Sequence, residues 1–231
     1  IKNSSRVYPF IRFNQGKKVH NKVVEVEQIS KAYDDLSIIE KYSITINAGD
    51  RIAIIGENGI GKTTFLKCLV EKNFINKGVI KWSENATIGY FPQNHGEQFK
   101  SNISLLDWMA KWGQQDDDMQ TIRGTLGRLL FSQDDILKPL SVLSGGEQRR
   151  MLFGKIILQR ANVIILDEPT NHLDMESIES LNHALNLFDG TTLFVSHDRE
   201  IISSIATRII EIKEDKIEEY SDYQDYQLSL K

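Results

Sequence analysis

The feature that most constrains how this chain can fold is the segment GENGIGKTT at residues 56–64. It matches the pattern GxxxxGK[ST], follows the apolar run RIAIIG and opens a segment with helical periodicity at 61–70. Glycines let successive backbone N–H groups turn inward around phosphate oxygens. In such a loop Lys62 reaches the β- and γ-phosphates, and the Thr63 hydroxyl binds Mg²⁺. The sequence therefore predicts a nucleotide site whose loop residues are Gly56, Glu57, Asn58, Gly59, Ile60, Gly61, Lys62, Thr63 and Thr64.

A second apolar run, VIILDEP at 163–169, ends in two carboxylates. A buried strand there delivers Asp167 to its carboxyl end, where the carboxylate can hold Mg²⁺ through water. Glu168 follows directly and would face the γ-phosphate, where it can polarise the attacking water. The alternative is a pair of solvated acids that end a strand. Because a phosphate loop needs an acidic partner strand, we assign Asp167 to the metal and Glu168 to catalysis.

Three further side chains lie at predicted strand ends. His197, in FVSHDRE, could reach the γ-phosphate, although a lone histidine there is more often structural. Gln93, in FPQ, can coordinate Mg²⁺ or water. Tyr33, in SKAYDD, can stack on a base, with ordinary packing as the alternative.

The segment LSGGEQRRMLF at 143–153 predicts a second anion site. Ser144, Gly145 and Gly146 directly precede a helical pattern, so free N–H groups and the positive dipole end point the same way. Arg149 and Arg150 follow, and we interpret them as a solvated helix face rather than as phosphate or RNA ligands. One chain thus carries two phosphate cradles.

Strand and helix patterns alternate along the chain and predict an α/β fold with a parallel sheet wrapped by helices. Predicted strands lie at 23–29, 36–46, 51–56, within 78–93 (two strands), 163–168, 191–196 and 208–213. A block with helical periodicity at about 101–160 is inserted between the two halves of this sheet.

Composition bounds the functional class. The 28 Lys and Arg against 32 Asp and Glu give a net charge of −4, so bulk charge does not indicate a nucleic-acid binder. No apolar run approaches the roughly 18 residues of a membrane helix. The one cysteine, Cys68, is expected to be a small buried hydrophobe. The chain begins at Ile1, so we expect a piece of a longer protein in which residues 1–21 end a linker that packs onto the domain through Pro9–Phe13.

In this order and spacing the motifs resemble the nucleotide-binding domain of ABC ATPases over residues 22–213. The resemblance implies the ABC-type P-loop fold, with an antiparallel β sub-lobe and a helical sub-lobe at about 98–158 within a domain at 22–231. It also implies that two such domains pair head to tail and hold each ATP between them. The second cradle, with Glu147 where transporters usually carry Gln, would then bind the γ-phosphate on the partner domain through Ser144, Gly145 and Gly146.

The motif EPTNHLD at 168–174, together with SGGE and SHDRE, is similar to ABC-F proteins. These proteins carry two ABC domains in one chain and no membrane part, and are mostly ribosome-associated translation factors. KWSENATIGY, GRLLFSQDDI and NHLDMESIESLN resemble the second, C-terminal domain of one bacterial branch of this family. The implied partners are the first ABC domain of the same full-length chain and the ribosome or its RNA, in the cytoplasm. The isolated fragment would be a monomer or a weak homodimer with slow turnover.

The resemblance implies a role for each residue that matches a motif of the family, with ATP and Mg²⁺ as the ligands. Tyr33 would stack on adenine, Gly59–Thr64 would hold the phosphates, and Gln93 would sense metal and water. Asp167 would bind Mg²⁺, Glu168 would be the catalytic base, His197 the γ-phosphate switch, and Asp174 a contact to the opposite domain. Two alternatives stay open: an ATPase subunit of a membrane ABC transporter, and a module that senses ATP without hydrolysing it.

Overall fold

A computed structural model describes residues 8–230, which cluster into two compact units. We call residues 15–93, 162–169 and 189–230 the sheet unit, and residues 8–14, 94–161 and 170–188 the helical unit. The predicted linker residues 1–7 lie outside the described part of the chain.

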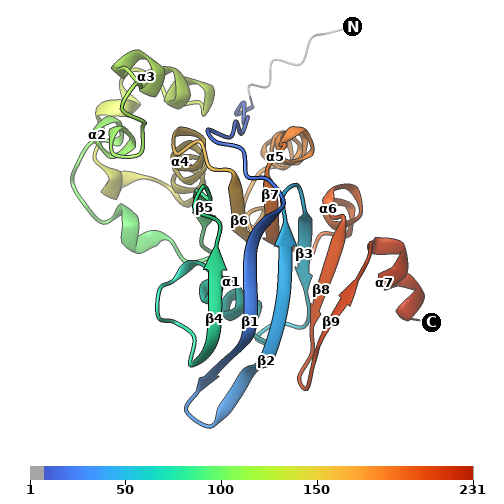
Figure 1. Ribbon diagram of the computed structural model, residues 1–231. Helices are drawn as coiled ribbons and strands as arrows, with labels where there is room; N and C mark the ends of the chain where they lie inside the picture. Colours follow the sequence, from blue (N-terminus) through green and yellow to red (C-terminus); the bar gives the residue numbers. More distant parts are fainter. Residues whose placement is uncertain (1–7, 231) are drawn as a thin grey trace, which may run out of the picture. The chain divides into compact units, whose positions relative to one another are not determined.

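A six-stranded sheet forms the centre of the sheet unit, in the order β5-β6-β7-β3-β8-β9 (Figure 1). Its strands are β5 (Ile88–Phe91), β6 (Val163–Asp167), β7 (Thr191–Val195), β3 (Arg51–Ile55), β8 (Arg208–Ile212) and β9 (Ile217–Tyr220). All neighbours pair in parallel except β8 and β9. Every residue of β6 and β7 is buried, as expected for parallel strands covered on both faces. The carboxyl ends of β3, β5, β6 and β7 carry the predicted nucleotide-site motifs.

A smaller antiparallel sheet has the order β2-β1-β4. Its strands are β1 (Lys22–Tyr33), β2 (Leu36–Asn47) and β4 (Lys77–Trp82). Helix α1 (Lys62–Val70) shares one apolar core with both sheets through Phe65, Leu66 and Leu69. Cys68 on this helix is 2% exposed, which confirms that it is a small buried side chain. Burial raises the pKa of its thiol to about 11.

The predicted strand pair within 78–93 divides between the two sheets: β4 joins β1, and β5 joins β6. The buried side chain of Asn162 binds the segment between β4 and β5, which passes from one sheet to the other. Its amide nitrogen donates to the carbonyl oxygens of Asn85 (2.7 Å) and Lys17 (2.8 Å), and its carbonyl oxygen accepts from the Thr87 N–H (2.8 Å). Every hydrogen-bonding group of this amide thus serves the connection, which suits a polar group without solvent access.

After α6 (Arg199–Ile205) and β8, the chain adds β9 and α7 (Tyr223–Ser229), which the sequence analysis did not predict. Helix α7 lies beside β8 and β9 at the edge of the sheet (Figure 1). Both elements are short and rich in polar residues, so their structure depends on pairing and packing rather than on a local pattern.

The helical unit contains four α-helices and three 3₁₀ turns among its described residues. The α-helices are α2 (Leu105–Ala110), α3 (Met119–Arg128), α4 (Gly145–Leu158) and α5 (Met175–Leu187), and the 3₁₀ turns are η1 (Gly96–Phe99), η2 (Asp135–Leu137) and η3 (Leu140–Val142). Ser104, Asp118, Ser144 and Asp174 each cap the helix that follows by accepting a backbone N–H. Gly154 lets α4 pack closely, because a Cβ there would lie 2.5 Å from the Met109 methyl group.

The apolar stretch before β1 packs into the helical unit, as predicted for Pro9–Phe13. Ile11 and Phe13 are buried, and the rings of Phe13 and Phe188 lie 6.1 Å apart. The Ser180 hydroxyl donates to the Pro9 carbonyl oxygen (2.6 Å). The α/β architecture with a parallel sheet, an antiparallel sheet and a helical insertion is confirmed, while the sub-lobe bounds 98–158 stay a prediction.

Candidate active site

The loop between β3 and α1 depends on glycine at two tight positions. At Gly56 the backbone has φ 144°, and a Cβ would lie 2.4 Å from the Ile212 carbonyl oxygen. At Gly61, with φ 117°, a Cβ would lie 2.3 Å from the Ile38 Cγ2 atom. Gly61 also caps α1 without any side-chain hydrogen bond, so the first N–H groups of the helix are left for an anion.

Lys62 at the start of α1 is buried, with 6% of its surface exposed. Its Nζ donates to the carbonyl oxygens of Gly56 and Glu57, both at 2.8 Å. Burial lowers the pKa of Lys62, and the negative charges of Glu168 and Asp167 oppose that shift. The ammonium group is therefore already held inside the loop, where a phosphate can exchange with the two carbonyl oxygens.

Asp167 ends β6 with 0% exposure. Burial raises the pKa of its carboxyl, and the Thr63 hydroxyl and the Lys62 charge pull it down. Among the described residues, neither carboxylate oxygen has a partner with full hydrogen-bond geometry. An ionised carboxylate left in this state is costly, and a bound divalent cation would relieve the cost. The oxygen-rich set of Thr63, Gln93 and Asp167 fits Mg²⁺, and these are the residues that would hold it.

The Glu168 side chain contacts two other predicted site residues, Gln93 and His197. Its Oε2 accepts from the Gln93 side-chain amide (3.1 Å), and its Oε1 lies 3.4 Å from His197 Nε2. Its backbone is left-handed (φ 48°), and its N–H donates to the Val195 carbonyl oxygen (3.1 Å). A non-glycine residue in this region is uncommon, and such strain is concentrated at functional sites. Side chains that follow β5 and β7, the two neighbours of β6, thus restrain the orientation of the Glu168 carboxylate.

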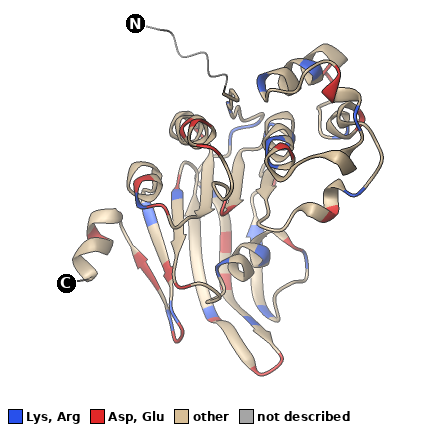
Figure 2. Cartoon of the chain, turned by 180° about the vertical axis from the view of Figure 1, so that it is seen from behind, with Lys and Arg blue, Asp and Glu red and all other residues tan. Residues whose placement is uncertain are grey.

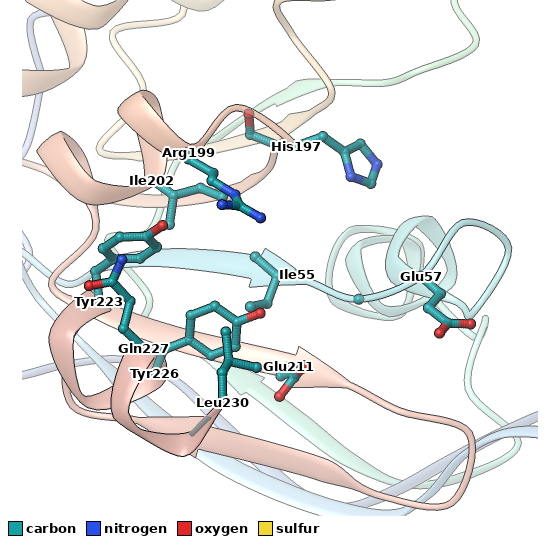
Figure 3. Close-up of a pocket in the computed structure, with 12 residues that line it drawn as sticks. Ile55, Glu57, His197, Arg199, Ile202, Glu211, Tyr223, Tyr226, Gln227 and Leu230 are labelled. Carbon is teal, nitrogen blue, oxygen red and sulfur yellow. The ribbon is translucent and has the colours of Figure 1, made fainter.

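The His197 side chain is half exposed and lines a cavity of about 340 Å³ together with Arg199 and Tyr226 (Figure 3). Asp198 caps α6 by accepting the Glu200 N–H (2.8 Å), which fixes the backbone next to the histidine. The imidazole therefore stands on a rigid support with open space beside it. Sequence reasoning missed Tyr226 as a neighbour, because α7 was not predicted.

Tyr33 ends β1 in the sheet unit, and its side chain is 45% exposed. Its ring packs edge-on against Phe74, with centroids 6.3 Å apart. The ring is therefore accessible to a ligand rather than part of the core. Sequence reasoning also missed Phe74, because the path of the loop after α1 gives no pattern signal.

The second predicted anion site, which we call the second cradle, lies in the helical unit, at the N-terminus of α4. Ser144 forms a capping box with Glu147, whose Oε2 accepts from the Ser144 N–H (2.8 Å) and hydroxyl (2.6 Å). Nothing lies within 4 Å of where a Cβ of Gly145 or Gly146 would stand. The two cradles therefore belong to different units of one chain.

The interpretation of the two arginines as a solvated helix face is wrong for Arg149, which is only 6% exposed. Arg150 is partly buried, and its guanidinium carbon lies 5.2 Å from the Phe131 ring centroid. The helix turns Arg149 inward because α4 packs against neighbours on more than one side, which a single amphipathic pattern does not reveal.

The residues collected here define a nucleoside-triphosphatase site of the P-loop class: a phosphate loop, a buried acid and a restrained second acid. The family model described as ABC transporter matches residues 39–171. The protein named probable ATP-binding protein YbiT, from Escherichia coli O157:H7, is 52% identical over 227 residues, covering 98% of this chain and 43% of that protein. ABC transporter F family member 5 from Arabidopsis thaliana is 37% identical over 218 residues, covering 94% and 31%. The chain therefore belongs to the ABC family of ATPases, and within it to the ABC-F group.

A solved bacterial Atm1-family ABC exporter with ATP bound has a TM-score of 0.75 at 18% identity, covering 99% of this chain and 43% of that one. This likeness shows the fold alone. The chain spans less than half the length of the curated relatives named above. Within residues 8–230, none of the helices has the length and apolar character needed to cross a bilayer.

Proposed function

We propose that this chain is the ATP-hydrolysing domain of a tandem ABC-F protein that acts on the ribosome in the cytoplasm, in the position of the second ABC domain. The observation that carries the hydrolytic part is the Glu168 carboxylate, held between Gln93 and His197 directly after the buried Asp167. A restrained carboxylate beside a phosphate loop is suited to take a proton from an attacking water.

In this proposal each residue has one task. Tyr33 stacks on the adenine, and the loop from Gly56 to Thr64 wraps the phosphates, with Lys62 as its charge. Thr63, Gln93 and Asp167 hold Mg²⁺, which when bound neutralises charge on the phosphates. Glu168 orients and deprotonates the water, and His197 contacts the γ-phosphate. The arrangement needs the His197 ring to move, and the cavity beside it gives room for that.

The presence of two cradles in one chain supports head-to-tail pairing of two domains. Ser144, Gly145, Gly146 and Glu147 would contact the γ-phosphate of ATP bound to the first ABC domain of the same full-length protein, and Asp174 would contact that domain. ATP favours the closed pair only because it touches both domains in that state. The isolated chain is then a monomer or a weak homodimer.

The ribosome role is supported by membership of the ABC-F group, not by charge. Lys and Arg residues are interspersed with Asp and Glu over the described elements, without one long basic stripe (Figure 2). The second candidate function, an ATPase subunit of a membrane transporter, is favoured by the description of the matching family model, ABC transporter. The two candidates differ in what the ATP-bound protein binds.

The test uses the full-length protein that contains this chain, with Glu168→Gln to slow hydrolysis. We expect it to sediment with ribosomes through a sucrose cushion when ATP is present, and to stay in the supernatant without ATP. The protein with unchanged Glu168 is the control and should sediment less in ATP. Association with washed membranes but not with ribosomes would favour the transporter candidate and contradict the ribosome role.

A further inference from the structure

The ammonium group of Lys31 lies over two aromatic rings. Its Nζ is 4.1 Å from the Phe74 ring centroid and 4.9 Å from the Tyr33 ring centroid. Both distances are within the range of a cation–π contact. In residues 8–230, no carboxylate lies within ion-pair distance of Lys31. The two rings are therefore what positions this charge.

Hydrogen bonds join the strand that carries Lys31 and Tyr33 to the loop after α1, the helix that follows the phosphate loop. The Ala32 N–H donates to the Asn76 side-chain oxygen (2.7 Å), and the Asn76 N–H donates to the Ser30 carbonyl oxygen (2.9 Å). The same loop starts at the C-cap of α1, where the Glu71 N–H donates to the Lys67 carbonyl oxygen (2.9 Å). Lys31, Tyr33 and Phe74 thus stand on the same packed unit as the phosphate loop.

An exposed tyrosine at a strand end loses rotamer freedom when a base stacks on it, and this loss weakens binding. Lys31 and Phe74 restrict the Tyr33 ring before any ligand arrives. Because the ammonium occupies one face of the ring, a base has the opposite face for offset stacking. The ring is therefore preorganised with one binding face.

We propose that Lys31 is a positioning residue of the base subsite: it clamps Tyr33 against Phe74 and so strengthens binding of purine nucleoside triphosphates, but not of base-free polyphosphate. This inference rests on the proposed function, because it takes Tyr33 as the residue that stacks on the base. It adds a role for Lys31 and Phe74 that the motifs do not identify.

The test compares Lys31→Met, which keeps the length of the side chain and removes its charge, with the matched control Lys81→Met. Lys81 lies on β4 of the same sheet and pairs with Glu27 (3.1 Å). Binding of Mg-ATP and of Mg-tripolyphosphate to the 231-residue chain is measured by isothermal titration calorimetry. We expect Lys31→Met to weaken ATP binding about 3- to 10-fold, as for a cation–π contact of moderate strength, and to leave tripolyphosphate binding unchanged. Lys81→Met should change neither.

Two further variants separate positioning from general stability. Lys31→Arg should keep ATP affinity within about twofold, because arginine also forms cation–π contacts. In a Tyr33→Leu background, Lys31→Met should cause no further loss, since a residue that acts through Tyr33 has nothing left to position. Phe74→Leu should weaken ATP binding in the same direction as Lys31→Met, with tripolyphosphate again unaffected.

Other results would overturn the role of Lys31. An equal loss for both ligands would mean a plain charge effect, and unchanged ATP affinity would mean no contribution. Failure of the proposed function gives a different result: the unmodified chain would bind no ATP, or would still bind it with Lys62→Ala. A chain that loses ATP with Lys62→Ala but not with Lys31→Met refutes only the Lys31 inference.

Discussion

The Asp167 carboxyl is fully buried, so its ionised form is unfavourable unless a cation lies beside it. Its pKa is raised mainly by burial, so the folded state favours the protonated form. The stabilisation from this shift is full at pH values below the usual carboxyl pKa and is lost as the pH rises through the folded-state pKa. At neutral pH without metal, the burial of the Asp167 carboxyl therefore destabilises the fold.

Asp167→Asn should accordingly stabilise the metal-free chain at neutral pH. We expect the melting temperature in EDTA to rise by about 2–4 °C, which corresponds to roughly 1 kcal/mol for a chain of this size. The gain over the unchanged chain should shrink as the pH is lowered toward 4. The same variant should lose the stabilisation that Mg-ATP gives the unchanged chain. Differential scanning fluorimetry across pH measures both effects, and a lower melting temperature in EDTA would contradict the unrelieved-charge explanation.

Glu168→Gln keeps the shape of the side chain and removes the base. We expect phosphate release by the full-length protein to fall by about 10²- to 10⁴-fold, the usual contribution of a general base, with ATP binding retained. Phosphate release and nucleotide binding are measured on the same preparation. Turnover equal to that of the unchanged protein would exclude Glu168 as the base.

At the scale of elements, the capping box of α4 places the second cradle. Burial opposes ionisation of Glu147, but the hydrogen bonds from Ser144 outweigh it and hold the pKa of this carboxyl below its usual value. The carboxylate and the serine thereby satisfy groups at the start of the helix that would otherwise lack partners. Ser144 is thus both a structural cap and a candidate phosphate ligand.

Ser144→Ala should destabilise the chain by about 1 kcal/mol through loss of the cap, independently of any nucleotide. Glu147→Gln is the matched comparison: it keeps an oxygen acceptor for Ser144, so its loss should be smaller. Urea denaturation followed by circular dichroism gives both values. If Ser144→Ala were as stable as the unchanged chain, the Ser144 hydroxyl would have no measurable capping role.

Most elements and the candidate site can be predicted from the sequence, because they follow from local hydrophobic patterns and from motifs at strand ends. Buried parallel strands such as β6 and β7 are short, mostly apolar segments. The carboxyl ends of β5, β6 and β7 meet at one edge of the sheet, and Gln93, Glu168 and His197, which follow these ends, therefore lie together. The sequence does not predict β9 and α7, because they are stabilised by pairing with and packing against β8 and have no clear hydrophobic pattern of their own. The place of Lys31 over two rings depends on the path of a loop, which residue types alone do not specify.

At the scale of the whole molecule, the phosphate loop and the second cradle lie in separate compact units. A complete site in the proposed function needs the phosphate loop of one domain and the cradle of another. The isolated chain should then hydrolyse ATP slowly, through transient pairs of identical copies.

We therefore expect the ATPase rate per molecule of the isolated chain to rise in proportion to protein concentration in the low micromolar range. Phosphate release at several concentrations measures this dependence. Ser144→Ala should lower the slope beyond its effect on stability, because it removes a ligand from each pair. A rapid rate that is independent of concentration would contradict the need for two domains.

The buried position of Cys68 also makes the chain convenient for fluorescence labelling. With a pKa of about 11, only about one Cys68 thiol in 10⁴ is ionised at pH 7, so maleimide dyes react with it very slowly. A cysteine introduced at an exposed position, such as Met175 in the helical unit or Val79 in the sheet unit, would be the one readily labelled thiol of this 231-residue chain. Dyes at such positions offer a way to follow the approach of two domains by energy transfer, one molecule at a time.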